Sequence, residues 1–124
     1  MNKSKSSITQ RIQSFVTAFR GIEYAIKSEL HVKVHLFAAL LVIICGFYFH
    51  ISQEEWLAVI ISIAMVLMAE LFNTAIELIG DYLSKDFDEQ IGKIKDIAAG
   101  AVLVTSICAM IIGILVFYPL IYSS

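Results

Sequence analysis

The sequence carries little charge. Asp, Glu, Lys and Arg make up only 16% of its 124 residues, whereas 59% of the residues are hydrophobic and the mean hydropathy is +0.82. A soluble domain usually has about 25% charged residues. The nine basic residues form no stripe, which argues against nucleic acid as a partner. We therefore predict an integral membrane protein, with residues 1–124 forming a single domain and little mass outside the bilayer.

Several chemical motifs are also absent from the sequence. The six glycines form neither G-x-x-x-x-G-K-[ST] nor G-x-G-x-x-G, so no glycine-rich phosphate-binding loop is predicted. No G-x-S-x-G motif marks a hydrolase nucleophile. The two cysteines, Cys45 and Cys108, match no metal-binding or redox spacing. Any chemistry must therefore come from other side chains.

Three long apolar segments are present, at residues 34–51, 56–80 and 97–122. Each approaches the length of about 20 helical residues that crosses a hydrocarbon core, and none alternates as a strand does. Residues 8–30 have apolar side chains at spacings of three and four, which predicts an amphipathic surface helix, with Ser7 or Thr9 as its N-cap. The predicted fold is all-α, with three transmembrane helices and one surface helix.

The basic residues lie on one side of this arrangement. Three spans place the N-terminal region and the polar linker at residues 81–96 on the same side of the membrane. That side holds every basic residue of the chain, namely Lys3, Lys5, Arg11, Arg20, Lys27, Lys33, Lys85, Lys93 and Lys95. The positive-inside rule then predicts a cytoplasmic N-terminus and a cytoplasmic linker.

The second apolar segment ends in a row of polar side chains. Glu70, Asn73, Glu77 and Asp81 fall within an arc of about 80° when each residue advances by about 100° around a helix. A carboxylate within a membrane costs roughly 2.5–3.5 kcal/mol on insertion scales. Hydrogen bonding between helices is one explanation for the row. The other is cation or phosphate–metal chemistry, because Mg²⁺ binds carboxylate oxygens.

Further candidates lie on the same side of the membrane. Lys95 and Asp96 precede the third span, and Glu29 precedes the first. Taken alone, the former is an ordinary interfacial charge pair and the latter a solvated surface charge. His31 and His35 are interpreted as interfacial residues. A subunit of an ion pathway or transporter also stays open as an alternative, because intramembrane carboxylates mark such routes.

Two motifs carry a family resemblance. The stretch "ELFNTAIE", continued to Asp81, and the stretch "KDIAAGAVLV", which begins at Lys95, resemble the prokaryotic diacylglycerol kinases, a family that includes the undecaprenol kinases. The likeness extends over about residues 10–119. It implies a homotrimeric helical bundle in the bacterial cell (inner) membrane, with active sites shared between subunits. It also implies transfer of phosphate from ATP, with Mg²⁺ as cofactor, to diacylglycerol or undecaprenol.

The resemblance also assigns roles to individual residues. It implies that Glu70 is the catalytic proton acceptor, that Glu29 and Glu77 are magnesium ligands, and that Glu70 and Ala99 contact the lipid substrate. The residues that it implies for ATP binding are Glu29, Asn73, Glu77, Asp86, Asp88, Lys95 and Asp96. Two positions depart from the family pattern. Gln10 stands where enteric members of the family have arginine, so that Arg11 is a candidate substitute, and Gly80 is expected to loosen the helix before Asp81.

The depth of the two glutamates fits this reaction. Glu70 and Glu77 are about 10 Å apart along a helix axis, and Glu70 is the deeper of the two. A lipid hydroxyl lies at the membrane boundary, whereas ATP arrives from the cytoplasm. We expect the acidic face to be buried by neighbouring subunits, because exposing it to lipid is costly.

Overall fold

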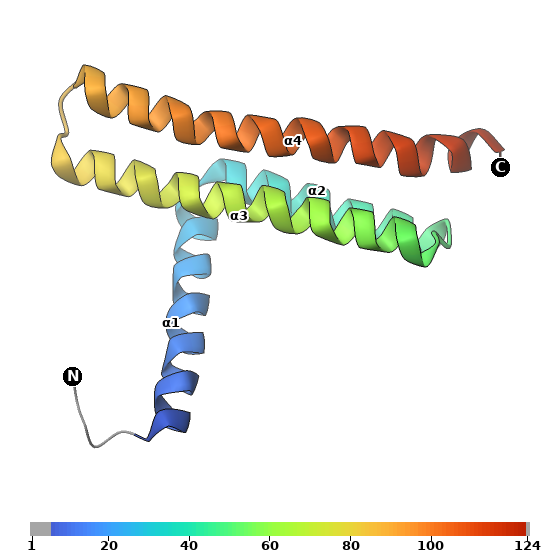
Figure 1. Ribbon diagram of the computed structural model, residues 1–124, viewed down its shortest axis with the longest axis horizontal. Coiled ribbons are helices and arrows are strands. Elements are labelled where there is room, and N and C mark those ends of the chain that lie inside the picture. Colours follow the sequence, from blue (N-terminus) through green and yellow to red (C-terminus); the bar gives the residue numbers. More distant parts are fainter. Residues whose placement is uncertain (1–5, 124) are drawn as a thin grey trace.

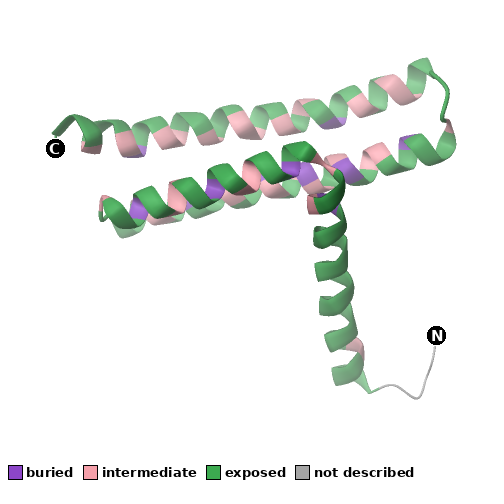
Figure 2. Ribbon diagram, turned by 180° about the vertical axis from the view of Figure 1, so that it is seen from behind, coloured by how far each residue is buried: buried purple, intermediate pink, exposed green. Residues whose placement is uncertain are grey.

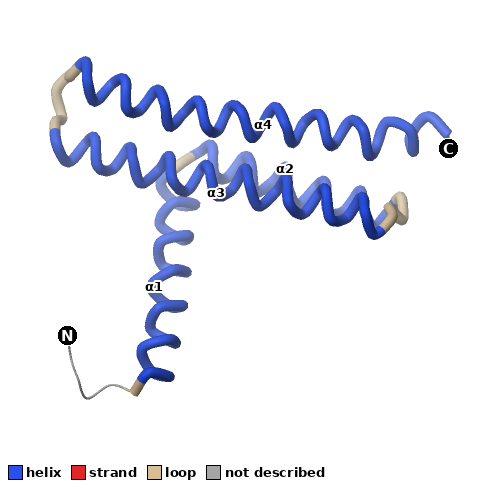
Figure 3. The backbone as a smooth tube through the Cα atoms, viewed as in Figure 1, coloured by secondary structure: helices blue, strands red, loops and turns tan. Residues whose placement is uncertain are grey.

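The structure, a computed structural model, describes residues 6–123 and consists there of four helices (Figure 1). They are α1 (Ser7–Ser28), α2 (Leu30–Tyr48), α3 (Gln53–Leu83) and α4 (Glu89–Ser123). Helices α2, α3 and α4 run alongside one another, and α1 points away from them. The part of the chain that the structure describes has no strand (Figure 3). The predicted all-α fold is therefore confirmed.

Helix α1 is attached to the bundle mainly at its C-terminal end. Its N-cap is Ser6, whose Oγ accepts a hydrogen bond from the backbone N–H of Thr9 at 3.1 Å, so the prediction of Ser7 or Thr9 as the cap was wrong. Near its other end, Lys27 donates a hydrogen bond of 2.6 Å to Glu23 and thereby holds the pKa of Glu23 below its ordinary value. Ala25 is its one buried residue. The exposed apolar side chains of α1 suit a helix that lies at a membrane surface.

The other three helices are long and apolar enough to cross a membrane. Both α3 and α4 continue beyond the apolar segments into the polar linker, so only residues 84–88 connect them. Helix α3 passes through Gly80 without interruption, and the backbone N–H of Ser84 donates to the carbonyl of Gly80 at 3.0 Å. The expectation that the helix loosens at Gly80 was therefore wrong.

The end of the bundle opposite this connection is closely packed. Ser52 and Glu55 form a capping box at the start of α3, with distances of 3.2 and 2.9 Å. The indole of Trp56 lies over Gly46, where an added Cβ would be only 2.6 Å from the ring. Ile51 and Val59 form a small core with Val116 of α4. This packing fixes the position of α3 relative to its two neighbours.

The single chain buries little of its surface. The buried positions lie where the helices face one another, and most of the remaining surface is exposed (Figure 2). In the most apolar stretch of each span, 28% of the residues are buried in α3, 11% in α2 and 6% in α4. Helix α3 is thus the central element, and the outer apolar faces are available to lipid or to other subunits.

Candidate active site

Glu70 lies at the centre of the structure. It is on α3, is 2% exposed, and is the largest fully buried side chain among the described residues. One of its carboxylate oxygens, Oε1, lies 3.0 Å from Nε2 of His35 on α2. This contact is close, but Oε1 has no partner in hydrogen-bond geometry within the described part of the chain. A buried carboxylate with an unfilled acceptor position can receive a hydroxyl group.

The position of His35 differs from its interpretation as an interfacial residue. Its side chain is 26% exposed, and its imidazole faces Glu70. His31 is exposed, and its interpretation as an interfacial residue stays a prediction. The contact between His35 and Glu70 also bears on the expected role of neighbouring subunits in burying the acidic face. Because α2 already covers Glu70 within a single chain, the expectation that its burial depends on neighbouring subunits was wrong for this residue.

A second group of charges lies toward the α3–α4 connection. Nζ of Lys95 is 2.7 Å from Oδ1 of Asp81 and 3.4 Å from Oε2 of Glu77. Lys95 therefore pairs across to α3, so the alternative of a simple charge pair with Asp96 was wrong. Gly80 allows this approach, because an added Cβ at that position would lie 2.7 Å from Cε of Lys95.

The two charge groups occupy different environments on α3. The side chain of Glu70 is only 3% exposed, whereas that of Glu77 is 34% exposed and that of Asp81 is 66% exposed. Because Glu77 and Asp81 follow Glu70 by two and three helical turns, the groups are roughly 10–16 Å apart along the axis. The arrangement separates a buried carboxylate from a partly exposed cluster of charge.

Asn73 lies between these two groups. Its side-chain oxygen Oδ1 is buried and has no hydrogen-bond partner among the described residues. The residue lines a groove of about 270 Å³ between α3 and α4, together with Ala98. Asn73 therefore does not join two helices within the single chain, and its carbonyl oxygen is available to another group.

The remaining predicted site residues are spread more widely. Glu29 forms the non-helical corner between α1 and α2 and has no ion pair among the described residues. Asp86 and Asp88 lie in the α3–α4 connection beside a hollow of about 210 Å³ that Lys95 also lines. Oδ1 of Asp88 accepts hydrogen bonds from the N–H groups of two residues in the first turn of α4, at 2.9 and 3.1 Å, and so caps that helix. These hydrogen bonds hold Asp88 in place, and Lys95 is held by its contacts with Glu77 and Asp81.

Four other candidate residues do not join the charged group around Lys95. Asp96 and Ala99 are exposed on α4, and Arg11 is exposed near the start of α1. Gln10 is partly buried, and its backbone N–H donates to the carbonyl of the N-cap at 3.0 Å. The single chain therefore brings together Glu77, Asp81 and Lys95, and it leaves Glu29 and Asp96 outside this group.

Comparisons with known proteins agree with the motifs. A family model described as prokaryotic diacylglycerol kinase matches residues 16–117. An undecaprenol kinase of Bacillus subtilis is 36% identical over 115 residues, which are 93% of this chain and 94% of that protein. A diacylglycerol kinase of Synechocystis is 33% identical over 101 residues, 81% of this chain and 58% of that protein.

A more distant relative matches the chain over a similar number of residues. A diacylglycerol kinase of Escherichia coli is 25% identical over 111 residues, which are 90% of this chain and 91% of that protein. The family resemblance seen in the stretches that contain Glu70 and Lys95 is confirmed. The chain belongs to the prokaryotic diacylglycerol kinase family and is a membrane-embedded lipid kinase.

Proposed function

We propose that this kinase transfers the γ-phosphoryl group of ATP, with Mg²⁺, to the hydroxyl group of undecaprenol or diacylglycerol. The observation that carries the proposal is the difference in depth between Glu70 and the group formed by Glu77, Asp81 and Lys95. A lipid hydroxyl approaches from the bilayer and a nucleotide from water. A buried base beside a hydrated cluster of charge meets both requirements.

Glu70 is the base in this mechanism. Its carboxylate accepts the proton of the lipid hydroxyl while that oxygen forms a bond to the γ-phosphorus. The bond between the γ-phosphorus and the bridging oxygen of ADP breaks, and ADP leaves. Phosphoryl transfer requires mainly positioning and charge stabilisation, so one base and a few well-placed charges are sufficient. The product is undecaprenyl phosphate or phosphatidic acid.

The carboxylates of Glu29 and Glu77 suit Mg²⁺. The ion usually takes one or two protein carboxylates and completes its shell with water and phosphate oxygens. The described part of the chain contains no group of three or more His, Cys, Asp or Glu side chains that could hold a metal by itself. When bound, the ion neutralises charge on the phosphates. Glu77 must then share its contact with Lys95, which lies 3.4 Å away.

The nucleotide is assigned to the same end of the bundle. Lys95 supplies positive charge for the phosphates, and Asn73 supplies an unpaired carbonyl oxygen. The other proposed contacts with ATP are Glu29, Glu77, Asp86, Asp88 and Asp96. The hollow beside the α3–α4 connection, lined by Asp86, Asp88 and Lys95, gives support to this part of the proposal.

The lipid is assigned to an apolar surface near Glu70. A groove of about 510 Å³ between α1 and α3 is lined by Leu71 and Thr74, which are one and four residues beyond Glu70. Ala99 is proposed as a further lipid contact on α4. Undecaprenol is the first acceptor to test because a relative named undecaprenol kinase matches nearly the whole chain. Diacylglycerol is the second because two further relatives are named for it.

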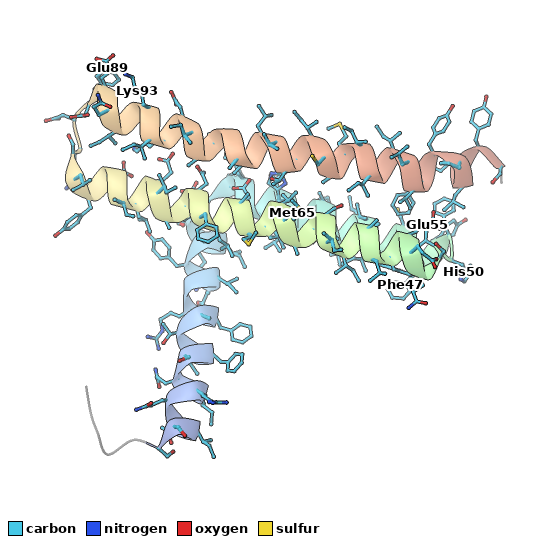
Figure 4. All side chains as sticks on the ribbon, in the orientation of Figure 1. Phe47, His50, Glu55, Met65, Glu89 and Lys93 are labelled. Carbon is cyan, nitrogen blue, oxygen red and sulfur yellow. The ribbon has the colours of Figure 1, made fainter. Side chains whose placement is uncertain are left out.

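We also propose a homotrimer in the bacterial inner membrane, with the N-terminus and the α3–α4 connection in the cytoplasm. Glu89 and Lys93 lie at the end of the bundle where α3 passes into α4, and Phe47, His50 and Glu55 lie at the opposite end (Figure 4). Lys85, Lys93 and Lys95 belong to the α3–α4 connection and the first turns of α4 at the first end, and the positive-inside rule favours a cytoplasmic side for such residues. Lys3 and Lys5 lie outside the described residues.

Two isosteric substitutions test the mechanism. Glu70→Gln should lower kcat by roughly 10²–10⁴-fold and leave nucleotide affinity nearly unchanged, because a base acts mainly in the transition state. Glu77→Gln should lower kcat and weaken the dependence on Mg·ATP together. The measurements are turnover, Mg²⁺ dependence and ATP affinity in one lipid mixture. Near-native turnover in both variants would show that the acidic face is only structural.

The same assay addresses the alternative of an ion-pathway subunit. A kinase consumes ATP only when an acceptor lipid and Mg²⁺ are both present. Parallel assays with undecaprenol and with diacylglycerol, each at several concentrations, rank the two acceptors by kcat/KM. ATP consumption that does not depend on either lipid would contradict the proposed function.

A further inference from the structure

The contact between His35 and Glu70 has no role in the mechanism described so far. Their facing atoms, Nε2 and Oε1, are 3.0 Å apart, and the Glu70 side chain is only 3% exposed. A cavity of about 90 Å³ lies beside His35, and its other lining side chains are alanine, valine, leucine and isoleucine. The two residues therefore form a polar pair in apolar surroundings.

A carboxylate in such surroundings does not stay ionised alone. Transfer of an isolated charge from water into a low-dielectric medium is costly, and a carboxyl group avoids this cost by keeping its proton. A protonated carboxyl group cannot accept another proton from a lipid hydroxyl. A base at this depth therefore needs a positive or hydrogen-donating partner, and among the described residues His35 is the one basic side chain in contact with Glu70.

We propose that His35 is the positioning residue for the base, which it holds in orientation and keeps ionised through the charge of its imidazolium. This inference rests on the proposed function of Glu70. The proton of the lipid hydroxyl moves to Glu70, and the imidazolium keeps its own proton during the step. The proton on Glu70 then returns to water after the phosphorylated lipid leaves. The arrangement resembles the general pattern in which a catalytic base is oriented by a third group.

Other titratable groups lie further along the same helices. Helix α2 contacts Glu70 through His35, and α1 and α4 also pack against α3. Tyr24 of α1 is a titratable residue in the groove that Leu71 and Thr74 of α3 line. None of these groups forms an ion pair with His35 or Glu70 within the described chain. The titratable groups nearest in sequence or toward the α3–α4 connection are Glu29, His31, Lys33, Glu77, Asp81, Lys95 and Asp96.

The pH dependence of kcat tests the proposal. His35→Gln retains a hydrogen-bond donor but removes the charge, whereas His35→Lys retains a positive charge. His31→Gln is the matched control, because His31 is one turn earlier on α2, exposed, and without an ion pair among the described residues. All variants are compared as full-length protein in the same lipid mixture, with thermal unfolding as a check on folding.

We expect His35→Gln to lower kcat at neutral pH by about 10²-fold, the low end of the range for loss of general-base function. The acid limb of its pH profile should move to higher pH, so that activity recovers in alkaline buffer, and KM for ATP should stay within about twofold. His35→Lys should restore the native acid limb. His31→Gln should leave the profile unchanged.

Three results would overturn the proposal. They are an unchanged profile in His35→Gln, an equal loss of kcat at every pH, and a change confined to KM for ATP. Inactivity of the native protein with both lipids would instead contradict the proposed function. A native enzyme that loses activity in Glu70→Gln but keeps its profile in His35→Gln would refute only the role of His35.

Discussion

The substitution Gly80→Ala gives a quantitative test of how Lys95 is held. In the structure, an added Cβ would lie 2.7 Å from Cε of Lys95 and 3.0 Å from Cγ2 of Ile91, whereas ordinary contacts are 3.4–4 Å. The flexible lysine side chain must therefore move away by roughly an ångström. We expect this movement to lengthen its 2.7 Å contact with Asp81 or its 3.4 Å contact with Glu77.

Two effects on stability oppose each other in this variant. Replacement of glycine by alanine inside a helix stabilises it by about 1 kcal/mol. Weakening of the ion pairs offsets part of this gain, and only part, because the carboxylate of Asp81 is largely exposed and that of Glu77 partly so, and solvent screens such pairs. The free energy of unfolding should therefore rise by less than about 1 kcal/mol. Thermal or denaturant unfolding in detergent measures this quantity.

The effect on activity should be much larger. If Lys95 contacts the phosphates, its displacement removes a charge-assisted hydrogen bond worth about 1.5–3 kcal/mol. The expected loss in kcat/KM for Mg·ATP is then roughly 10- to 150-fold. The assay is ATP consumption at saturating lipid with varied Mg·ATP.

Gly113→Ala is the matched control, since a Cβ at Gly113 would meet nothing within 4 Å. It should gain the full helix stabilisation of about 1 kcal/mol and keep native activity. Gly80→Ala with native kcat/KM and the same stabilisation as the control would refute the reasoning, because Lys95 would then not depend on the missing Cβ.

Three further predictions concern topology, packing and assembly. Ser84→Cys in sealed cells should resist an impermeant thiol reagent applied outside, and labelling from outside would contradict the cytoplasmic placement of the α3–α4 connection. Gly46→Val should destabilise the protein by about 1–3 kcal/mol, because its side chain would overlap Trp56, and an unchanged unfolding temperature would contradict this packing. Chemical crosslinking in native membranes should yield trimers, and a fully active monomer in detergent would exclude the proposed assembly.

Much of the architecture could be predicted from the sequence because it depends on local properties. Apolar length fixes the presence of the three spans, and helical periodicity places Glu70 and Glu77 on one face of α3. The extent of α3 and α4 was less predictable. A polar segment such as residues 81–96 does not end a helix by itself, and most of it is helical.

The partners of the functional side chains could not be predicted, since they depend on how the helices pack. Whether His35 or His31 faces Glu70 is decided by the rotation and register of α2 against α3, which no single helix encodes. A titratable residue within an apolar helix was the one available signal for His35. Similarly, the absence of a Cβ at Gly80 was expected to loosen helix α3. In the structure, this absence lets the side chain of Lys95 on α4 lie close to α3.

The tight turn between α2 and α3 has a consequence for membrane insertion. Only residues 49–52 connect the two helices, and neither lysine nor arginine occurs between Lys33 and Lys85. Placement of this turn on the far side of a bilayer would move no lysine or arginine across, and the capping box satisfies backbone groups at the start of α3. Helices α2 and α3 are thus joined by a short, capped turn without lysine or arginine, which suits a helical hairpin within a membrane.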